Sequence, residues 1–541
     1  MGTKYDLVII GGGITGLLAA KEALGAGLTV LLIEKGSEYR PPLDPERINL
    51  YRRQWWSEGT EEVPEHFNFG PYARYRNAWP TSKDFKDLVE IEGIRGTWAF
   101  RYNMKIGVGG SGKVWSGMSW RLHPDDFACH SRFGHSADWP VSYDELVPYY
   151  AEVERMFGVS GPAIEDSSAW PWKTDYPYPA FPRNELSNRI ADLLAPDLQF
   201  VDQPHAVIND PSSSHTCIGA KTCVQRCPTG AIFHPDERWL PDIVHHEAFE
   251  IVTDAFVTHL ALSENGTKVD AVHYVVDGIE AVAYGDTVVL AANTVENIMI
   301  LNRTAQSAGR DVANGSETLG RYFSSHGAAS FTFTAESPTF PGRGRPTHIS
   351  SLTPMIKADR RAQAGYVIEV WSADFSLGMS PWEQYWNLYS QRGEWGRSLF
   401  NHVSDYHHRN QLVFVFETEM TNAKRLVAAN SQAKIGRAIT YPSARDQEAM
   451  DRVIADGLAL GARPGIRSVS LSGCGLNGNH PLGGYRMSHS PRDGVVDSYC
   501  RAHDIPNLVI LGGGVFCSTG VLNPTLTISA IALRAIRALI H

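Results

Sequence analysis

Two segments near the C-terminal end of the sequence combine residue types that could move a proton. Residues 479–487 read Asn-His-Pro-Leu-Gly-Gly-Tyr-Arg-Met and contain His480, and residues 520–527 read Gly-Val-Leu-Asn-Pro-Thr-Leu-Thr. A neutral histidine can accept the proton of an alcohol while a hydride leaves the carbon. A single histidine in a glycine-rich loop is more often structural. The presence of both segments in one chain favours a functional interpretation of His480.

The second segment also has the composition of a helix start. Asn523 suits an N-cap position, and Pro524 suits the first helical position, where its missing N–H costs nothing. We therefore predict a helix from Pro524 to about Ile540. The positive end of its dipole would stabilise negative charge on a group in front of it, such as the pyrimidine edge of a reduced flavin.

A glycine-rich motif at the other end of the chain indicates a nucleotide site. Residues 11–16, Gly-Gly-Gly-Ile-Thr-Gly, fit the pattern G-x-G-x-x-G. They lie between an apolar run at 6–10, expected to be a buried strand, and a predicted helix at 14–26. A second buried strand is expected at 29–33, so the segment predicts a βαβ unit.

Each residue of this motif has a physical role. Gly11 permits a tight turn, Gly13 lets the backbone approach a pyrophosphate, and Gly16 allows close packing of helix on strand. The helix N-terminus offers free N–H groups to the phosphates. Glu34 follows the second strand, where a carboxylate accepts hydrogen bonds from ribose hydroxyls. We predict a dinucleotide, and the motif's position at residue 11 together with the C-terminal segments favours FAD over NAD.

Three cysteines form a third group that could do chemistry. Cys217, Cys223 and Cys227 have the spacing C-x5-C-x3-C, and a proline follows the last. Thiolates this close in sequence could converge on one metal centre, as in ferredoxins. The alternatives are inert thiols, or a zinc site that lacks a convincing fourth ligand, although His215 and His234 are nearby.

Other segments predict the elements that position these residues. A capping box of Ser142 and Glu145 begins a predicted amphipathic helix. Apolar runs at 286–292 and 507–511 are expected to be buried strands. Residues 335–422 are only weakly periodic, and we expect them to be irregular.

The totals exclude several classes of protein. At 541 residues the chain is long enough for two packed domains, and its net charge of −10 argues against a nucleic-acid partner. No run reaches the 18 or more apolar residues that a membrane span requires, and no secretion signal is visible. We therefore expect a cytoplasmic protein, although a subunit can be exported together with a partner that carries the signal.

Taken together, these segments resemble the glucose–methanol–choline (GMC) oxidoreductase family over nearly the whole chain. The blocks that carry the resemblance are residues 11–16, 107–111, 139–150, 288–293, 319–321, 479–487 and 507–527. The resemblance implies an α/β fold with a Rossmann-type FAD-binding domain and a substrate-binding domain made of a sheet flanked by helices. It implies an FAD domain from 1–40, 95–120, 205–330 and 472–541, with 121–204 and 331–471 forming the substrate domain and cap elements.

The resemblance also assigns the site. His480 matches the family's catalytic histidine, and Asn523 matches its partner, which would hold the substrate hydroxyl. Val114 stands where some members have a histidine bonded to the flavin, so we expect FAD to be non-covalent. Gly512 replaces a common Asp, which leaves that contact to the backbone of Gly513 and Gly514. The expected cofactor-binding residues are Gly11, Gly13, Ile14, Thr15, Gly16, Glu34, Gly109, Gly110, Ser111, Ala292, Gly513, Gly514, Asn523, Pro524 and Thr525.

The implied reaction is oxidation of a CH–OH group of a sugar, polyol or glycoside. The cysteine spacing resembles that of bacterial sugar and polyol dehydrogenase subunits, in which three cysteines hold a 3Fe-4S cluster. That reading implies an electron-accepting partner such as a cytochrome, and a small partner subunit. Without the cluster, an oxidase that produces hydrogen peroxide is the better interpretation. A flavin-binding subunit without catalytic activity is the alternative from another class.

Overall fold

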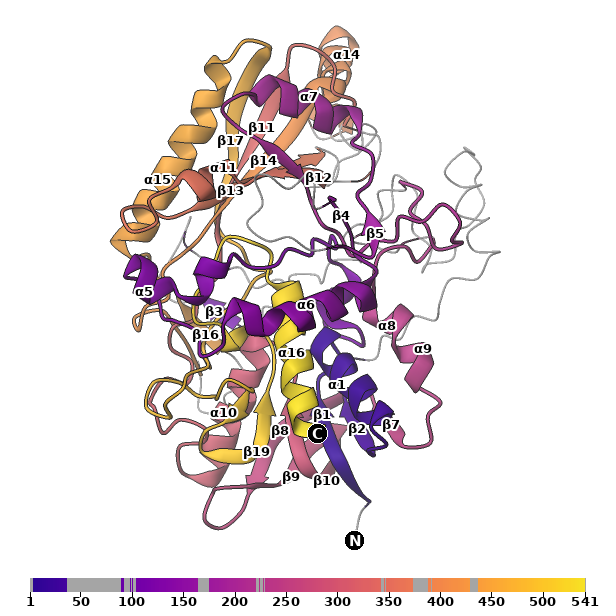
Figure 1. Ribbon diagram of the computed structural model, residues 1–541, viewed down its shortest axis with the longest axis vertical. Coiled ribbons are helices and arrows are strands. Elements are labelled where there is room, and N and C mark those ends of the chain that lie inside the picture. Colours follow the sequence, from indigo (N-terminus) through magenta and orange to yellow (C-terminus); the bar gives the residue numbers. More distant parts are fainter. Residues whose placement is uncertain are drawn as a thin grey trace.

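The computed structural model consists of two lobes, each built around a large sheet (Figure 1). It describes residues 3–36, 89–91, 98, 100, 104–163, 175–219, 223, 227, 229–341, 345, 347–372, 388–390, 392–428 and 436–540. The N-terminal strand and the C-terminal helix both belong to the lower lobe in this view. No helix in these ranges is long and apolar enough to cross a membrane.

The lower lobe contains a sheet of eight strands in the order β18-β19-β10-β1-β2-β7, with β8 and β9 extending from β10. Neighbours from β19 to β7 pair in parallel, whereas β9 pairs antiparallel with both β8 and β10. Its strands are β1 (Lys4–Ile10), β2 (Val30–Ile33), β7 (Phe249–Val252), β8 (Ala255–Leu262), β9 (Val269–Val276), β10 (Ile279–Leu290), β18 (Arg501–Ala502) and β19 (Ile505–Ile510). The central strands are apolar and almost fully buried, as parallel strands covered on both faces must be.

Helices cover this sheet. α1 (Ile14–Gly25) packs against α16 (Thr525–Ile540), which packs in turn against α6 (Tyr143–Phe157), and α10 (Thr294–Ala308) packs against β8. The predicted capping box begins α6: Ser142 and Glu145 exchange hydrogen bonds, and the helix ends at Gly158 in the left-handed region. The βαβ unit predicted for the nucleotide site is therefore present as β1, α1 and β2.

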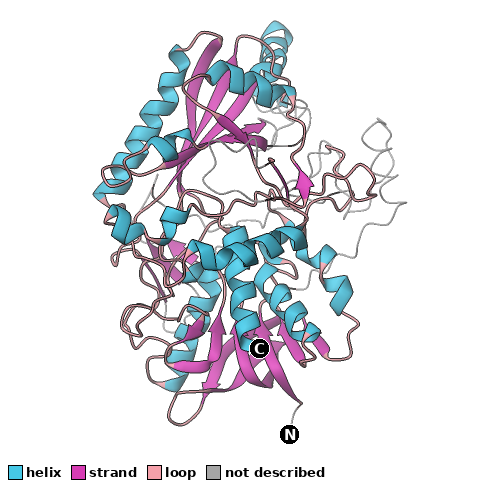
Figure 2. Ribbon diagram, in the orientation of Figure 1, coloured by secondary structure: helices cyan, strands magenta, loops and turns pink. Residues whose placement is uncertain are grey.

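The upper lobe contains an antiparallel sheet in the order β17-β11-β14-β13-β12-β6. Its strands are β6 (Phe200–Asp202), β11 (Gly327–Ala335), β12 (Thr347–Ser351), β13 (Tyr366–Ser372), β14 (Arg409–Phe416) and β17 (Ile466–Leu476). α15 (Ala444–Ala459) lies along one face, where Gly457 leaves room for the Phe331 ring (Figure 2). Among the described residues, this lobe also contains the helices α7 (Glu185–Leu194), α11 (Thr353–Lys357) and α14 (Gly396–Ser404).

Further small elements complete the described structure. They are the sheet β15 (Arg425–Ala428), β16 (Gly436–Ile439) and β3 (Val89–Ile91), the pair β4 (Ser160–Gly161) and β5 (Tyr178–Pro179), and the short helices α5 (Cys129–Phe133), α8 (Pro235–Arg238) and α9 (Leu240–Ile243). The predicted α/β fold with two domains is confirmed. The expectation that 335–422 would be irregular was wrong, because β12, β13 and β14 lie there. β11 and β17 also each cross a domain boundary placed at 330/331 and 471/472.

Candidate active site

A cavity of about 730 Å³ lies between the two lobes. That volume is within the range of small-molecule and cofactor sites. Its lower wall comes from the ends of β1 and β2, the start of α1 and the segment before α16, and its upper wall comes from β11, β13 and β14. His480 and Asn523, which are far apart in sequence from the glycine-rich motif, both line this cavity with it.

The glycine-rich turn at one end of the cavity has the shape that a pyrophosphate requires. Gly11 has φ +105°, and a Cβ there would lie 2.6 Å from the Ala291 carbonyl oxygen. A Cβ at Gly16 would lie 1.9 Å from the Gly11 oxygen, whereas none of the described atoms lies within 4 Å of a Cβ at Gly13. Gly13 thus opens the backbone to the cavity in front of α1, where N–H groups and the helix dipole favour phosphate.

Glu34 is held at the end of β2 by backbone donors. Its carboxylate accepts hydrogen bonds from the N–H groups of Gly12 at 2.7 Å, Gly36 at 2.9 Å and Gly107 at 3.2 Å. Glu34 also lines the cavity. The carboxylate is therefore fixed in place beside the turn, where the sequence predicted a ribose contact.

Most of the predicted cofactor-binding residues share this cavity. Twelve line it, namely Gly11, Gly13, Ile14, Thr15, Glu34, Gly110, Ser111, Ala292, Gly513, Asn523, Pro524 and Thr525. Gly16 packs α1 on β1, and Gly109 donates its N–H to the Gly12 oxygen. Gly514 packs on the Tyr485 ring, so Gly512 and Gly513, not Gly514, border the cavity.

The start of α16 differs by one residue from the expected position. The helix begins at Thr525, and the Pro524 carbonyl accepts the first helical hydrogen bond, from Ile528 at 2.9 Å. Pro524 therefore occupies the N-cap, and Asn523 precedes it. Nothing in the described chain forms a hydrogen bond with the Asn523 side chain, so its amide is available to a bound group in the cavity.

His480 has an unexpected neighbour. Its Nδ1 lies 3.0 Å from Nδ1 of His326, whose Nε2 lies 2.9 Å from the Thr519 carbonyl oxygen. Asn477 Nδ2 lies 3.3 Å from the same His480 nitrogen. Burial lowers the pKa of His326 to about 4 and, together with the adjacent His326, lowers the pKa of His480 well below its usual value. Both imidazoles are therefore neutral at neutral pH.

His326 lies beside His480 because of the strand pairing. Gly327 at the start of β11 pairs with Leu476 at the end of β17. His326, just before β11, therefore lies beside the segment after β17 that contains His480. Sequence reasoning missed His326. No motif marks it, and it is 154 residues from His480.

A buried ionic network lies next to the residues that hold His326. The Arg360 guanidinium pairs with Asp126 at 2.6 Å and with the Glu417 carboxylate. The next residue, Thr418, donates its backbone N–H to the Thr519 hydroxyl at 3.0 Å, and that hydroxyl donates to the Thr418 carbonyl, also at 3.0 Å. The network is thus connected through Thr519 to the carbonyl that His326 contacts.

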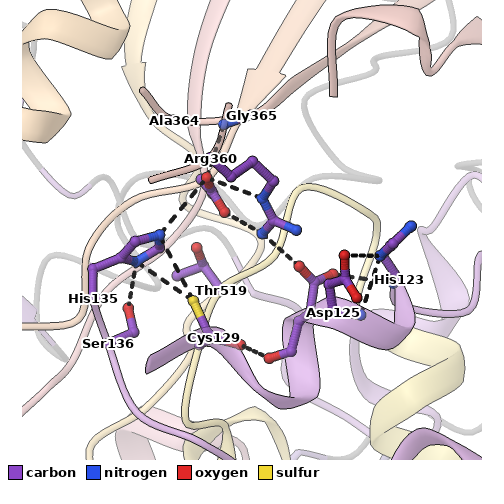
Figure 3. Close-up of polar contacts among 12 residues, drawn as sticks. His123, Asp125, Cys129, His135, Ser136, Arg360, Ala364, Gly365 and Thr519 are labelled. Carbon is purple, nitrogen blue, oxygen red and sulfur yellow. Dashed lines mark hydrogen bonds and ion pairs between the residues drawn. The ribbon is translucent and has the colours of Figure 1, made fainter. Parts of the chain in front are cut away.

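Cys129 and His135 lie at the edge of the same network and superficially resemble a nucleophile and base. Figure 3 shows His135 between Cys129 and Ser136, with Arg360 nearby. The Cys129 Sγ is 3.5 Å from His135 Nδ1. Burial raises the pKa of this thiol far above its usual value and lowers that of His135. The thiol stays protonated and sealed from solvent, so this pair is structural.

Comparisons with known proteins agree with this geometry. The model of the family described as GMC oxidoreductase matches residues 417–532, and an FAD binding domain model matches 6–41. The fructose dehydrogenase large subunit of Gluconobacter japonicus is 26% identical, with 99% of this chain and 98% of that protein covered. The chain belongs to the GMC oxidoreductase family.

Other relatives also match this chain over nearly its whole length. Paromamine 6'-oxidase of Streptomyces fradiae is 25% identical over 99% of this chain and 91% of that protein. The crystal structure of pyridoxine 4-oxidase from Mesorbium loti has a TM-score of 0.64 at 19% identity and covers 98% of both chains, which shows the shared fold. This GMC chain is an FAD-dependent oxidoreductase, and the turn, the open backbone at Gly13 and the cavity fit that cofactor.

The three cysteines gather around one small apolar cluster. Cys227 is buried with Val207 and Ile232, and Cys217 and Cys223 pack against this small apolar cluster. Burial raises the pKa of Cys223 to about 12 and also raises that of Cys217. Across the part of the chain that the structure describes, no three His, Cys, Asp or Glu side chains are arranged to hold a metal ion. The expected cluster and the zinc alternative are therefore not supported, and no electron-transfer step is assigned to these thiols.

Proposed function

We propose that the chain oxidises a CH–OH group of a sugar, polyol or glycoside, with His480 accepting the hydroxyl proton as a hydride leaves the carbon. The single observation that carries this proposal is the pair of contacts His480–His326 and His326–Thr519 at 3.0 Å and 2.9 Å. These contacts determine which nitrogen of His480 carries a proton.

The Thr519 carbonyl can only accept a hydrogen bond, so Nε2 of His326 carries a proton and donates it. Because burial keeps His326 neutral, its Nδ1 is then unprotonated and accepts. The 3.0 Å contact therefore requires a proton on Nδ1 of His480. Nε2 of His480 is left as a lone pair, which is the form that a general base needs.

The Asn477 amide does not reverse this assignment. Asn477 Oδ1 accepts from the Asn479 N–H at 3.0 Å, which directs the Asn477 Nδ2 toward His480 at 3.3 Å. If Nδ1 of His480 accepted that longer contact, the shorter one would require a doubly protonated His326. Burial disfavours that cation.

Other residues complete the reaction. Asn523 offers an amide that can hold the substrate hydroxyl on the cavity side. The start of α16 directs its free N–H groups and positive dipole end into the cavity beside Asn523, which favours negative charge there. Bound FAD supplies the two-electron acceptor for the hydride at its N5 atom. Gly11, Gly13 and Glu34 would hold the cofactor, and Val114, which lines the cavity, offers no nucleophile for a covalent bond.

The names of relatives that match this chain over nearly its whole length support the substrate class. They include a fructose dehydrogenase large subunit, a 2-methyl-1,2-propanediol dehydrogenase and a paromamine 6'-oxidase. All three names indicate small molecules with more than one hydroxyl group. We propose that electrons then leave to an external acceptor, such as a partner subunit or a cytochrome.

The test is the rate of anaerobic flavin reduction by a panel of sugars and polyols. We expect His480→Ala to lower the limiting rate at least 100-fold with full FAD content, and His245→Ala, an exposed histidine, to leave it unchanged. Turnover of His480→Ala within a few-fold of the unmodified enzyme would overturn the assignment of the base. Stoichiometric hydrogen peroxide in air would instead support the oxidase alternative, and no reduction by any alcohol would support the non-catalytic alternative.

A further inference from the structure

Two polar side chains on the upper wall of the cavity have no role in the proton transfer described above. Glu369 on β13 and Gln411 on β14 both line the cavity, yet they are only 4% and 6% exposed. Trp371, two residues after Glu369, lines the same wall.

The sheet register explains why these side chains gather on one face. Trp371 pairs with Gln411, and Glu369 pairs with Val413, the second residue after Gln411. Because side chains alternate between the two faces of a strand, all of these residues point to the cavity face. The intervening Leu412 and Phe414 lie on the opposite face, where Phe414 packs against Phe331.

The hydrogen bonding of these groups is incomplete within the described protein. Gln411 Oε1 is buried and has no partner. The Glu369 carboxyl accepts one hydrogen bond, from Trp371 Nε1 at 2.9 Å, and it forms no ion pair with the described residues. Burying acceptors in this way costs free energy unless a partner is present. Because both side chains line the cavity, a molecule bound there can supply the missing partners.

We propose that Glu369, Gln411 and Trp371 form a roof subsite that binds hydroxyl groups of the substrate remote from the carbon that is oxidised. Hydroxyls suit the roof subsite because they donate to both unsatisfied acceptors and can also accept from a carboxyl or an amide. Trp371 adds aromatic surface for the C–H groups of a sugar ring. This inference rests on the proposed function, and it specifies a polyhydroxylated substrate rather than a simple alcohol.

The state of the carboxyl agrees with this choice. Burial raises the pKa of Glu369 to about 7, against the opposing effect of the Trp371 hydrogen bond. A carboxyl with this pKa is present in both protonation states near neutral pH. It can therefore pair with a hydroxyl as donor or acceptor, whereas an ammonium group would need the charged form alone.

The experiment measures substrate binding to the FAD-loaded enzyme separately from chemistry. Anaerobic stopped-flow reduction gives the substrate dissociation constant and the limiting rate for D-fructose, D-sorbitol, D-glucosamine and butan-1-ol. The variants are Glu369→Gln, Glu369→Ala and Gln411→Ala, and Glu336→Ala, an exposed carboxylate just after β11 in the same sheet, is the control. Flavin content and circular dichroism confirm that each variant folds.

For the polyol that reduces the enzyme best, we expect Glu369→Ala and Gln411→Ala to raise the dissociation constant about tenfold. Glu369→Gln keeps a hydrogen-bonding group and should raise it less than about threefold, with limiting rates within about threefold throughout. Butan-1-ol and Glu336→Ala should show no change.

Two results would overturn the inference alone. One is polyol binding that is unaffected by Glu369→Ala and Gln411→Ala. The other is a preference for D-glucosamine that Glu369→Gln abolishes as fully as Glu369→Ala, which would make the roof subsite a cation site. Reduction by butan-1-ol with no polyol binding up to about 100 mM would overturn both the inference and the proposed substrate class, while leaving the assignment of His480 as the base intact. Failure of the proposed function is distinguishable, because it appears as full turnover in His480→Ala.

Discussion

Nδ1 of His326 lies 3.0 Å from Nδ1 of His480, and the Thr519 carbonyl holds the far side of the His326 ring at 2.9 Å. A backbone carbonyl therefore sets the proton positions on two successive imidazoles. The start of β11 pairs with the end of β17, and this pairing brings His326 next to His480. His326 does not line the cavity with His480, so it acts as a positioning residue.

Replacing His326 should impair the base without removing it. His326→Phe removes the acceptor for His480 Nδ1–H, so the other tautomer becomes accessible and the limiting rate of flavin reduction should fall about 10- to 100-fold. His326→Asn can place its amide oxygen at the Nδ1 position and should recover most of that loss. A merely structural role predicts equal loss in both variants, and that outcome would contradict the assignment.

The pH dependence of reduction should lack the usual histidine titration. Burial lowers the pKa of His480 well below its usual value. The neutral, proton-accepting form therefore persists as the pH falls through about 6.5, and protonation disables the base only at lower pH. We expect the rate of anaerobic reduction by a saturating substrate to vary less than about twofold between pH 6 and 8. A half-maximal rate near pH 6.5 would show that His480 titrates normally.

The cofactor half of the site was predictable because its signals are local. Gly11 and Gly16 mark a turn in which a Cβ would clash, and the adjacent apolar strands are covered on both faces. The periodicity of such runs is enough to place β1, α1 and β2 within a few residues. The helix α16 starts one residue later than predicted, because Asn and Pro are both common at the first positions of a helix and do not fix its exact start.

The substrate half was less predictable because its strands carry polar residues on a buried face. Glu369 and Gln411 point into a cavity, so the alternation that marks an ordinary half-exposed strand is broken. His326 has no sequence signal, since its role arises from pairing between distant strands. The cysteine spacing suggested a metal centre, but packing with Val207 and Ile232 decides the arrangement of these thiols in the described structure.

The glycines of the nucleotide turn should differ sharply in their tolerance of a methyl group. A Cβ at Gly16 would lie 1.9 Å from the Gly11 oxygen, whereas the described atoms leave open space at Gly25 of the same helix. Gly16→Ala should lose most of its FAD because the turn must move. Gly25→Ala should keep FAD and gain up to about 1 kcal/mol of stability. Flavin absorbance per protein and thermal unfolding measure both effects, and equal FAD retention in the two variants would contradict the proposed geometry of the turn.

The buried network behind His326 should make stability depend on pH through Glu417. Burial alone would raise the pKa of Glu417, but Arg360 outweighs it and the pKa is about 2. Since the folded value lies below the unfolded value of about 4.3, this stabilisation is fully present above that value and is lost as the pH falls toward 2. Glu417→Gln leaves Arg360 with only Asp126, so we expect a loss of about 3–5 kcal/mol at pH 7. That difference should shrink as the pH is lowered from 5 toward 3 in urea unfolding.

The control is Asp405→Asn, which breaks a half-exposed ion pair with Arg467 and should cost less than about 1 kcal/mol. A Glu417→Gln loss that stayed constant with pH would mean that packing, and not charge, accounts for the effect.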